Sequence, residues 1–415
     1  MAAPGLIVAT MSTPHFSIVL PTKGRSFLVG HAIRSVLAQS FPDFELIVTD
    51  NDDGDATHQA VQLFHDPRLR YVRTGGLNMQ DNWERGANEA TGEYLLVLED
   101  KQMLKSTALA QLAGHIRRFQ PEVLRWTSDS FDDELVPPRI RRGKGDGSVR
   151  MAHPDTLLAA FLGDFDQGYK STLPLPQLSC LHRPLLARIK AGPMRRLFHP
   201  VAPDVVLALL LLNEAEAVCE IKSSLVLYVS SLHSNGRSVT HKGQTGRQFL
   251  RQLPGGENDC YDHVPVKCVT VPGSIYNDFQ RTRLKVGGRL ARHELNWTKY
   301  FVECYSAFLG PLGAGVDMTP ELREWERALG EQPAAFQQSV RDALVARRLA
   351  VPSALGIARN QLGRTLGFTR LTRWGKHLYR GRLKQDPEWR FTDPIAYYEW
   401  DCEQARAAAG SSPRQ

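Results

Sequence analysis

The chain has few cysteines, and none of them forms a recognisable pair. Only six of the 415 residues are cysteine, and no two stand in a C-x-x-C motif. Cysteines that are scattered singly argue against a structural zinc site and against a disulfide framework. The pattern therefore predicts a protein of a reducing compartment. The six are Cys180, Cys219, Cys260, Cys268, Cys304 and Cys402.

Long hydrophobic runs are also missing. The longest run, 205–212, lies between Asp204 and Asn213. A run of this length is too short to cross a bilayer and predicts a buried helix. The first residues, MAAPGLIVATMSTP, lack the basic region and the long apolar core that are typical of a signal peptide. These two observations predict a cytoplasmic protein.

Two common nucleotide-binding motifs are absent from the start of the chain. The first predicted strand is followed by PTKGR, which matches neither G-x-G-x-x-G nor G-x-x-x-x-G-K-[ST]. This excludes the dinucleotide-binding turn of a dehydrogenase and the phosphate-binding loop of an NTPase.

Positive charge is distributed unevenly. The formal net charge is +7, and the segment 351–384 contains eight Lys or Arg residues and no acid, so the rest of the chain has a charge of −1. Apolar residues alternate with these cations, which is typical of an amphipathic helix on an anionic membrane. A solvated helix face that packs on the rest of the protein is the more common explanation of such a pattern. Nucleic acid is not an expected partner, because no recognised binding module accompanies the segment.

Strands and helices alternate over the first 130 residues. We expect strands at 16–20, 45–49, 69–72, 94–98 and 123–126. Ser26 and Ser106 are the expected N-caps of two helices, and further helices are expected at 56–64 and 78–90. This rhythm predicts an α/β fold with a mostly parallel sheet flanked by helices. Residues 131–150 are rich in Pro, Gly and charge and are expected to form a surface loop.

Polar residues follow three of these strands directly. They are Pro21-Thr22 after the first strand, Asp50-Asn51 after the second, and Glu99-Asp100 after the buried run YLLVL. The carboxyl ends of neighbouring parallel strands converge on one crevice, where such sheets bind ligands. A carboxylate there can accept hydrogen bonds from a base or a ribose, and another can hold a cation against a diphosphate.

Four segments carry a resemblance to a known family: FSIVLPTKGR, SVLAQSFPDFELIVTDN, RLRYVRT and NWERGANEATGEYLLVLED. In this order and spacing, over about 15–125, the chain resembles a family 2 glycosyltransferase with the nucleotide-diphospho-sugar transferase (GT-A) fold. A weaker match covers 176–240. The resemblance implies a flexible N-terminus at 1–14 and a glycosyltransferase domain at 15–242. A mostly helical region follows at 243–415.

The glycosyltransferase domain divides further by this resemblance. Its first half, 15–130, would bind the nucleotide-sugar donor, and its second half, 131–242, would bind the acceptor. The implied nucleotide-binding residues are Pro21, Thr22, Arg25, Asp50, Asn51 and Glu99. Alternatives remain open, because Thr22 could cap a turn, Asp50 could cap the next helix, and Arg25 could be solvated.

The chain departs from the family at the D-x-D motif, where it has Glu99, Asp100 and Lys101. An ammonium group cannot ligate a cation, so the divalent metal, Mg or Mn, is uncertain. Either Asp100 holds the metal, or Lys101 neutralises the departing diphosphate directly. A third alternative is an inactive site.

Asp204 resembles the family's catalytic base, which removes the proton from the acceptor hydroxyl. It precedes an apolar helix, so its alternative role is an N-cap, which would lower its pKa. Asp164 and Asp166 are the fallback candidates for the base. His233 resembles a histidine that closes the diphosphate or metal site, although a loop histidine is usually only solvated.

The resemblance implies inverting transfer of a sugar from a nucleotide-diphosphate donor to a hydroxyl acceptor. Synthesis of a surface polysaccharide, a glycolipid or a glycoprotein is the expected context. A non-catalytic nucleotide-sugar-binding or scaffold protein is the alternative from another class. Membrane contact through 351–384 would place the protein at the inner face of the membrane.

Overall fold

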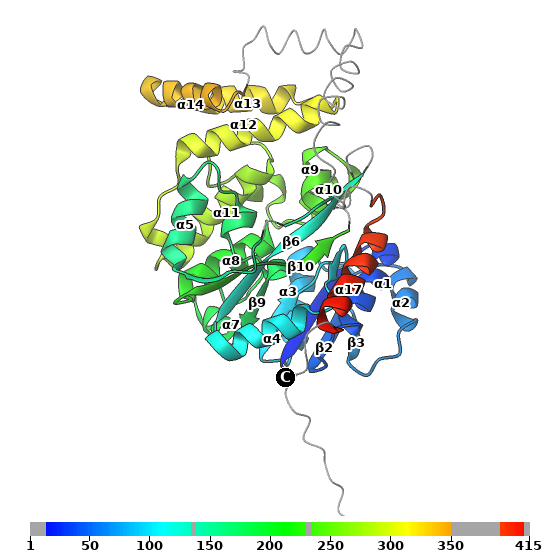
Figure 1. Cartoon of the computed structure of the whole chain (residues 1–415). Coiled ribbons are helices and arrows are strands. Elements are labelled where there is room, and N and C mark those ends of the chain that lie inside the picture. Colours follow the sequence, from blue (N-terminus) through cyan, green and yellow to red (C-terminus); the bar gives the residue numbers. More distant parts are fainter. Residues whose placement is uncertain (1–13, 134–137, 144, 230–233, 350–390, 411–415) are drawn as a thin grey trace, which may run out of the picture.

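A mixed ten-stranded sheet forms the centre of the chain in a computed structural model that describes residues 14–133, 138–143, 145–229, 234–349 and 391–410. The strand order is β3-β2-β1-β4-β9-β6-β10-β5, with β7 paired to β6 and β8 paired to β10. Helices cover both faces of this sheet, and a stack of helices extends beyond one end (Figure 1). The strands are β1 (Phe16–Thr22), β2 (Phe44–Asp50), β3 (Leu69–Arg73), β4 (Tyr94–Val97), β5 (Gln102–Leu104), β6 (Val123–Asp132), β7 (Arg139–Arg141), β8 (Val149–Ala152), β9 (Ser179–His182) and β10 (Val218–Tyr228).

The helices follow the strands in the order that the sequence predicts as far as α4. They are α1 (Ser26–Leu37), α2 (Ala56–Gln62), α3 (Met79–Glu89), α4 (Ala108–Phe119), α5 (Pro154–Gly163), α6 (Tyr169–Thr172), α7 (Arg183–Ala191), α8 (Pro203–Glu214), α9 (Asn235–Thr240), α10 (Gln244–Arg251), α11 (Val271–Val286), α12 (Trp297–Gly313), α13 (Thr319–Gly330), α14 (Ala334–Ala346) and α17 (Pro394–Gly410). None of the helices in this part of the chain is long and apolar enough to cross a membrane.

The first half of the sheet is parallel, as predicted. β1 pairs in parallel with β2 on one side and with β4 on the other, and β2 pairs in parallel with β3. Every residue of β1 and β2 is buried, because helices cover both faces of a parallel sheet. Beyond β4 the sheet becomes mixed, since β9 runs antiparallel to both β4 and β6. The predicted class, a mostly parallel sheet flanked by helices, is confirmed.

Two hydrophobic cores lie on opposite faces of the sheet. Val19 and Val97 point into one core with α5, α8, α11 and α12, whereas Ile18 and Leu96 point into the other with α1 and α4. Successive side chains of a strand point to opposite faces, so a continuously apolar strand serves both cores. The run 205–212 is buried throughout within α8, as predicted.

The loop expected at 131–150 contains strands, so this prediction was wrong. β6 continues to Asp132, β7 pairs with it, and β8 pairs with β10. Ion pairs between strands, such as Arg141 with Asp132, replace the apolar alternation from which strands are usually recognised. Two predicted N-caps also differ. Ser26 is the first residue of α1, whose N-cap position is Arg25, and the N-cap position of α4 is Thr107 rather than Ser106.

Helix α17 returns to the sheet from the far end of the sequence. Its residues Tyr397, Tyr398 and Cys402 are buried in a cluster with residues of β5, β6, β7 and β10. The hydroxyl of Tyr398 donates a hydrogen bond of 2.9 Å to the carbonyl of Leu104, a residue 294 positions earlier. The helices α12, α13 and α14 lie apart from it, at the other end of the molecule (Figure 1). The basic segment 351–384 lies outside the described residues.

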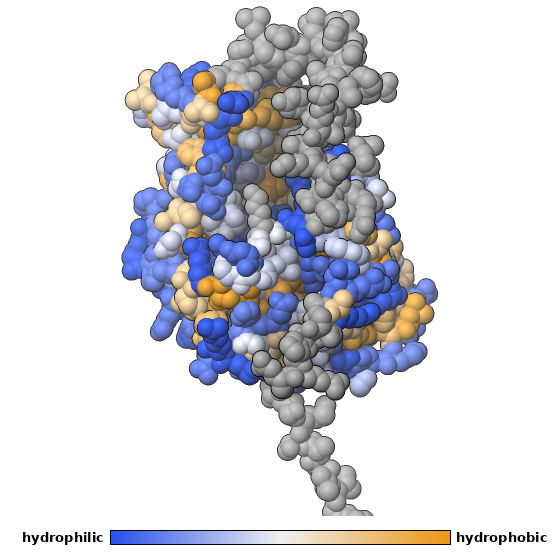
Figure 2. Space-filling view, viewed as in Figure 1, coloured by the Kyte–Doolittle hydropathy of each residue, from blue (hydrophilic) through white to orange (hydrophobic). Residues whose placement is uncertain are grey.

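The side of the molecule that faces the viewer in Figures 1 and 2 is largely hydrophilic, with hydrophobic residues scattered among polar ones (Figure 2). The exposed large hydrophobic residues are Phe27, Leu63, Met151, Leu284 and Val345, which come from different elements. Single apolar residues of this kind are normal on a protein surface and indicate no binding site.

Gly92, just before β4, allows β4 to approach β1 closely. A Cβ at this position would lie 2.7 Å from the backbone nitrogen of Ser17. We therefore expect Gly92→Ala to lower the free energy of unfolding by ~1–3 kcal/mol, because the two strands would have to separate. Gly114→Ala in α4 is the matched control, since nothing lies within 4 Å of its Cβ. Alanine favours a helix over glycine, so urea unfolding should show the control to be slightly stabilised.

Candidate active site

The carboxyl ends of β1, β2 and β4 bring the predicted polar residues together. Thr22 is the register partner of Asp50 in the β1–β2 pair. The hydroxyl of Thr22 donates a hydrogen bond of 2.8 Å to Oδ2 of Asp100, which follows β4. Three strand ends that are far apart in sequence therefore meet at one edge of the sheet, where open α/β sheets bind ligands.

Asp100 is a deeply buried carboxylate at this edge. Its side chain is 1% exposed, and its Oδ2 also accepts a hydrogen bond of 2.8 Å from Nε of Arg25. Burial raises the pKa of Asp100, and the Arg25 guanidinium and the Thr22 hydroxyl oppose this rise. Its other oxygen, Oδ1, is buried and has no hydrogen-bond partner among the described residues. An unsatisfied buried acceptor of this kind indicates a place for a ligand, a water or an ion.

Asp50 and Asn51 hold the strand ends together by bonds within the protein. Oδ2 of Asp50 accepts a hydrogen bond of 2.7 Å from the hydroxyl of Tyr71, and Oδ1 accepts one of 2.9 Å from the backbone of Asp52. The Asn51 amide makes two hydrogen bonds with the backbone of Leu77. Asp50 does not cap α2, since Asp55 occupies that N-cap position. A nucleotide at Asp50 would have to share the remaining lone pairs of the carboxylate.

Glu99 and Lys101 form an ion pair beside Asp100. Nζ of Lys101 lies 3.4 Å from Oε1 of Glu99, and the two side chains are 11% and 21% exposed. The Lys101 carbonyl accepts a hydrogen bond of 2.9 Å from the backbone of Val229, which follows β10. The lysine is therefore fixed between the β4 strand end and the end of β10.

Asp204 is connected to this strand end by a chain of hydrogen bonds. Nε2 of Gln177 donates to Oδ2 of Asp204 at 2.8 Å, and Nε2 of Gln102 donates to the Gln177 carbonyl at 3.3 Å. Oε1 of Gln102 in turn accepts a hydrogen bond of 2.8 Å from the Glu99 backbone. Asp204 is thus held close to the strand-end acids, although more than a hundred residues separate them in sequence.

The environment of Asp204 raises its pKa. Burial is the largest cause, the Gln177 amide opposes it, and the Glu99 carboxylate adds to the rise by repulsion. Ala202 occupies the N-cap position of α8, so Asp204 is already within the first turn. The alternative that Asp204 is a capping residue with a lowered pKa is therefore wrong for this structure. A carboxylate with a raised pKa is suited to accepting a proton near neutral pH.

Two tyrosines and two glutamines of this site were not predicted from the sequence. Burial raises the pKa of both Tyr169 and Tyr228, and the carboxylates of Glu99 and Asp204 raise them further. The two tyrosines therefore lie close enough to Glu99 and Asp204 for the carboxylate charges to change the pKa of each hydroxyl. Tyr228 ends β10 and Gln102 follows the LEDK turn, so the strand-end rule could have found both. Tyr169 and Gln177 lie in Pro-rich irregular sequence that carries no such signal.

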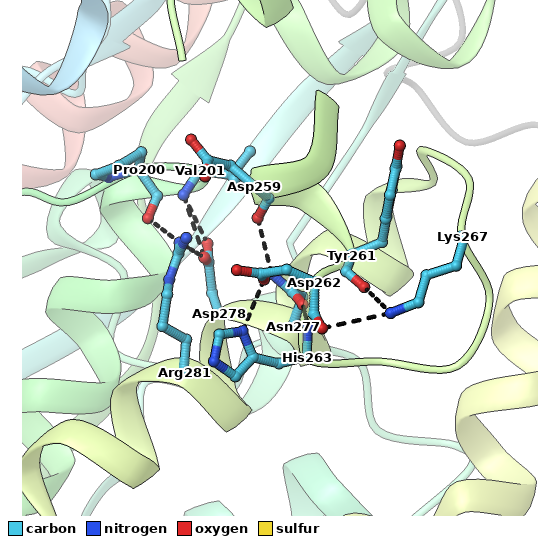
Figure 3. A network of polar contacts seen from close by, with 10 residues as sticks. All are labelled: Pro200, Val201, Asp259, Tyr261, Asp262, His263, Lys267, Asn277, Asp278 and Arg281. Atoms are coloured by element: carbon cyan, nitrogen blue, oxygen red, sulfur yellow. Dashed lines mark hydrogen bonds and ion pairs between the residues drawn. The ribbon is translucent and has the colours of Figure 1, made fainter. Parts of the chain in front are cut away.

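Asp278 of α11 fixes the segment that leads into α8 (Figure 3). Its carboxylate accepts hydrogen bonds from the backbone of Val201, at 3.1 Å, and of Ala202, at 2.8 Å. Arg281 pairs with Asp278 and also donates to the carbonyl of Pro200. Asp278 is fully buried. A helix outside the predicted glycosyltransferase domain therefore positions the start of the helix that carries Asp204.

The raised pKa of Asp278 should make the free energy of unfolding depend on pH. Burial raises its pKa to about 6, against the opposing effects of Arg281 and the two backbone groups. A pKa that is higher in the folded than in the unfolded state favours folding at low pH. This contribution, up to ~3 kcal/mol, should be lost as pH rises from about 4 to 7. Urea unfolding across this range should show a smaller fall in Asp278→Asn than in the wild type.

The control for this measurement is Asp53→Asn, which changes an exposed carboxylate near the strand ends. Its unfolding free energy should follow the wild-type pH dependence. Parallel curves for the wild type and Asp278→Asn would show that Asp278 does not change its charge in this range.

Three candidates from the sequence do not join the site as described. His233 lies outside the described residues. Asp164 and Asp166 are exposed in the loop after α5, and Asp166 pairs with Arg347 at 3.5 Å. Asp204, rather than this pair, is the acid that lies beside Glu99.

The part of the chain that the structure describes has no group of three or more His, Cys, Asp or Glu residues that could hold a metal ion. A divalent metal at this edge would therefore take few protein ligands. The free Oδ1 of Asp100 is an oxygen donor of the kind that Mg²⁺ or Mn²⁺ takes, with substrate phosphates as further ligands. The nearby positive side chains of Arg25 and Lys101 would repel the metal ion unless a diphosphate were also present.

Comparison with known proteins identifies the first part of this architecture. Residues 17–159 match the model of "Glycosyl transferase family 2". The chain therefore carries a family 2 glycosyltransferase domain, as the sequence resemblance predicted. The match covers β1 to α5, which includes the strand ends at Thr22, Asp50 and Asp100, but not Asp204.

Several curated proteins are similar to part of the chain. A GalNAc(5)-diNAcBac-PP-undecaprenol beta-1,3-glucosyltransferase of Campylobacter jejuni is 29% identical over 165 residues, which are 39% of this chain and 53% of the relative. A PGL/p-HBAD biosynthesis glycosyltransferase of Mycobacterium bovis is 30% identical over 118 residues, which are 28% of this chain and 46% of the relative. The chain thus spans about half the length of the curated relatives it matches.

A solved structure is also similar. Staphylococcus aureus TarS 1-349, in complex with UDP-GlcNAc, aligns with a TM-score of 0.46 and 15% identity, over 78% of this chain and 81% of that one.

Proposed function

We propose that this chain transfers a sugar from a nucleotide-diphosphate donor to a hydroxyl group of an acceptor, with inversion at the anomeric carbon. The observation that carries this proposal is the position of Asp204. Gln177 and Gln102 connect it to the strand end at Glu99, and burial raises its pKa. The family 2 match at 17–159 supports the nucleotide-sugar part of the proposal.

Asp204 is the proposed general base. As the acceptor oxygen forms a bond with the anomeric carbon, its proton passes to the Asp204 carboxylate. The bond between the anomeric carbon and the diphosphate oxygen breaks, and the nucleoside diphosphate leaves with the electron pair. Attack from the side opposite the leaving group inverts the configuration. Correct alignment of the two substrates supplies much of the acceleration in such a reaction.

The strand ends of β1, β2 and β4 are the proposed donor site. Pro21 and Thr22 would line the nucleotide, and Asp50, Asn51 and Glu99 would contact its base or ribose. Arg25 and Lys101 are positive side chains beside the buried Asp100, so they are placed to stabilise charge on the diphosphate. His233 stays a candidate for closing this site.

We also propose that Asp100, through its free Oδ1, holds a divalent metal together with the donor diphosphate. The metal would supply positive charge to the leaving group. Nucleotide release measured in EDTA should then fall by about a hundredfold or more, and added Mn²⁺ should restore it. Lys101→Met should retain this metal dependence. Lys23→Met, an exposed lysine after β1, is the matched control.

Activity without a metal would favour Lys101 as the group that neutralises the diphosphate. If activity survives EDTA in the wild type and is lost in Lys101→Met but not in Lys23→Met, Lys101 rather than a metal neutralises the diphosphate. Loss in both lysine variants would indicate a general effect of surface charge instead.

The biological context of the reaction is part of the proposal. The relatives from Campylobacter and Mycobacterium are named for a GalNAc(5)-diNAcBac-PP-undecaprenol substrate and for PGL/p-HBAD biosynthesis. We infer that this chain acts in the synthesis of a surface polysaccharide, a glycolipid or a glycoprotein. A peripheral membrane contact through 351–384 would bring it close to a lipid-borne acceptor. Sedimentation with anionic vesicles, compared between the full chain and Lys376→Glu/Arg380→Glu, tests this contact.

A further inference from the structure

We propose that a cavity lined by β6, β10 and the residues Lys170 and Ser171 binds a negatively charged, phosphate-type group of the acceptor substrate. The cavity has a volume of about 730 Å³. Its assignment to the acceptor rests on the proposed transferase function, whereas its affinity for phosphate can be measured independently.

The cavity lies beside an irregularity in the sheet. β6 and β10 run in parallel from Val123 and Val218, but their register shifts twice on either side of Ser224. Such a shift bends a strand and turns its side chains away from the regular ladder. Glu220, Ile221 and Lys222, which precede Ser224, all line the cavity.

Positive charge exceeds negative charge around the cavity. Its lining includes six cationic side chains and two carboxylates. Glu220 already pairs with Arg125, at 3.2 Å, and with Arg150, while Asp132 pairs with Arg141. The excess of positive charge should therefore attract an anion. The six cations are Lys101, Arg125, Arg141, Arg150, Lys170 and Lys222.

One buried hydrogen-bonding group of the lining, the hydroxyl of Thr127, lacks a partner among the described residues. The side chain of the preceding residue, Trp126, packs instead in the core that contains α1 and α4. A buried hydroxyl without a partner is costly, so its presence indicates a bound group with acceptor oxygens. A phosphate has such oxygens and the charge that the surrounding cations favour.

The cavity lies on the acceptor side of the candidate active site. Lys101 and Tyr228 belong to its lining, and Tyr228 is close enough to Asp204 and Glu99 for their charges to raise its pKa. In the sheet, β9 separates β6 from β4, so most of the cavity lies away from the proposed donor site at β1, β2 and β4, and Lys101 lies at the boundary between the two. A phosphate in the cavity would therefore belong to the molecule that presents its hydroxyl to Asp204.

Calorimetric titration of the full chain with glycerol 3-phosphate tests this proposal, with glycerol as the uncharged control. The test variant is Lys170→Glu/Lys222→Glu, which reverses two exposed cations of the lining. Arg117→Glu/Lys285→Glu reverses two exposed cations elsewhere and changes the net charge equally. We expect the wild type and the control variant to bind glycerol 3-phosphate but not glycerol. The test variant should bind it at least about tenfold more weakly.

Equal affinity in the two variants, or no binding to the wild type, would overturn the proposal. Phosphatidylglycerol and phosphatidylcholine vesicles separate the two sources of the phosphate. If the protein binds phosphatidylglycerol vesicles but not phosphatidylcholine vesicles, and only the test variant loses this binding, the phosphate is carried by a lipid. If the protein binds glycerol 3-phosphate but no vesicles, the phosphate belongs to a soluble acceptor. If glycerol 3-phosphate binds in the cavity but no nucleotide binds the protein, the transferase proposal fails while the phosphate site stands.

Discussion

Replacing Asp204 with asparagine should lower kcat for sugar transfer by about 10²–10⁴-fold, the range typical for loss of a general base. The amide has nearly the shape of the carboxylate, so the hydrogen bond from Gln177 can be kept by rotation of the amide oxygen toward it. Binding of the nucleotide donor should not change, because Asp204 is proposed to act on the acceptor. Transfer rates and donor affinity measured on the same preparation check this prediction.

The matched control is Asp164→Asn/Asp166→Asn, which changes two exposed carboxylates after α5. This variant should retain wild-type activity. Loss of activity in the control together with full activity in Asp204→Asn would move the base to the α5 loop. In the wild type, kcat should fall at low pH with an apparent pKa above the ordinary pKa of an aspartate, because burial raises the pKa of Asp204.

Tyr397→Ala should lower the free energy of unfolding by ~3–5 kcal/mol, as expected when a large buried aromatic residue is truncated. Tyr397 is fully buried between α17 and the sheet, where it packs with Phe131 and Leu227. Its hydroxyl also donates a hydrogen bond of 2.9 Å to Oδ2 of Asp129, which Lys105 pairs at 2.8 Å. The truncation would therefore leave a cavity and remove one partner of a buried carboxylate.

Two further variants separate these contributions in urea unfolding. Tyr397→Phe keeps the ring and should lose only ~1–3 kcal/mol, the cost of the hydrogen bond to a charged group. Gln404→Ala, on the exposed side of α17, should leave stability unchanged. If Tyr397→Ala is as stable as the wild type, α17 does not pack on the sheet in solution.

The donor half of the fold could be predicted from the sequence for a physical reason. In a parallel sheet covered on both faces, each strand is a continuous apolar run that ends in polar residues, such as the run that ends at Asp50. The same rule placed Thr22 and Asp100 at one edge, and they share a hydrogen bond. Local sequence carries this information because burial and strand ends are local properties.

Other features depend on contacts between distant segments. β9 has four residues, and its place between β4 and β6 follows from pairing that no local pattern encodes. The return of α17 to Leu104 and the support that Asp278 gives to Ala202 are equally long-range. The role of Gln177 at Asp204 depends on the same packing. The sequence predicted Asp204 only through its family resemblance, and its raised pKa could not be foreseen.

The proposed function requires an activated sugar to bind where β1, β2 and β4 end. A crystal structure of the full chain tests it most directly, grown with the nucleoside diphosphate that stabilises the protein most in a thermal-shift panel. We expect nucleotide density against Thr22, Asp50 and Asp100, with the terminal phosphate on the side of Asp204. Nucleotide density at another place, or no stabilisation by any nucleotide of the panel, would contradict it.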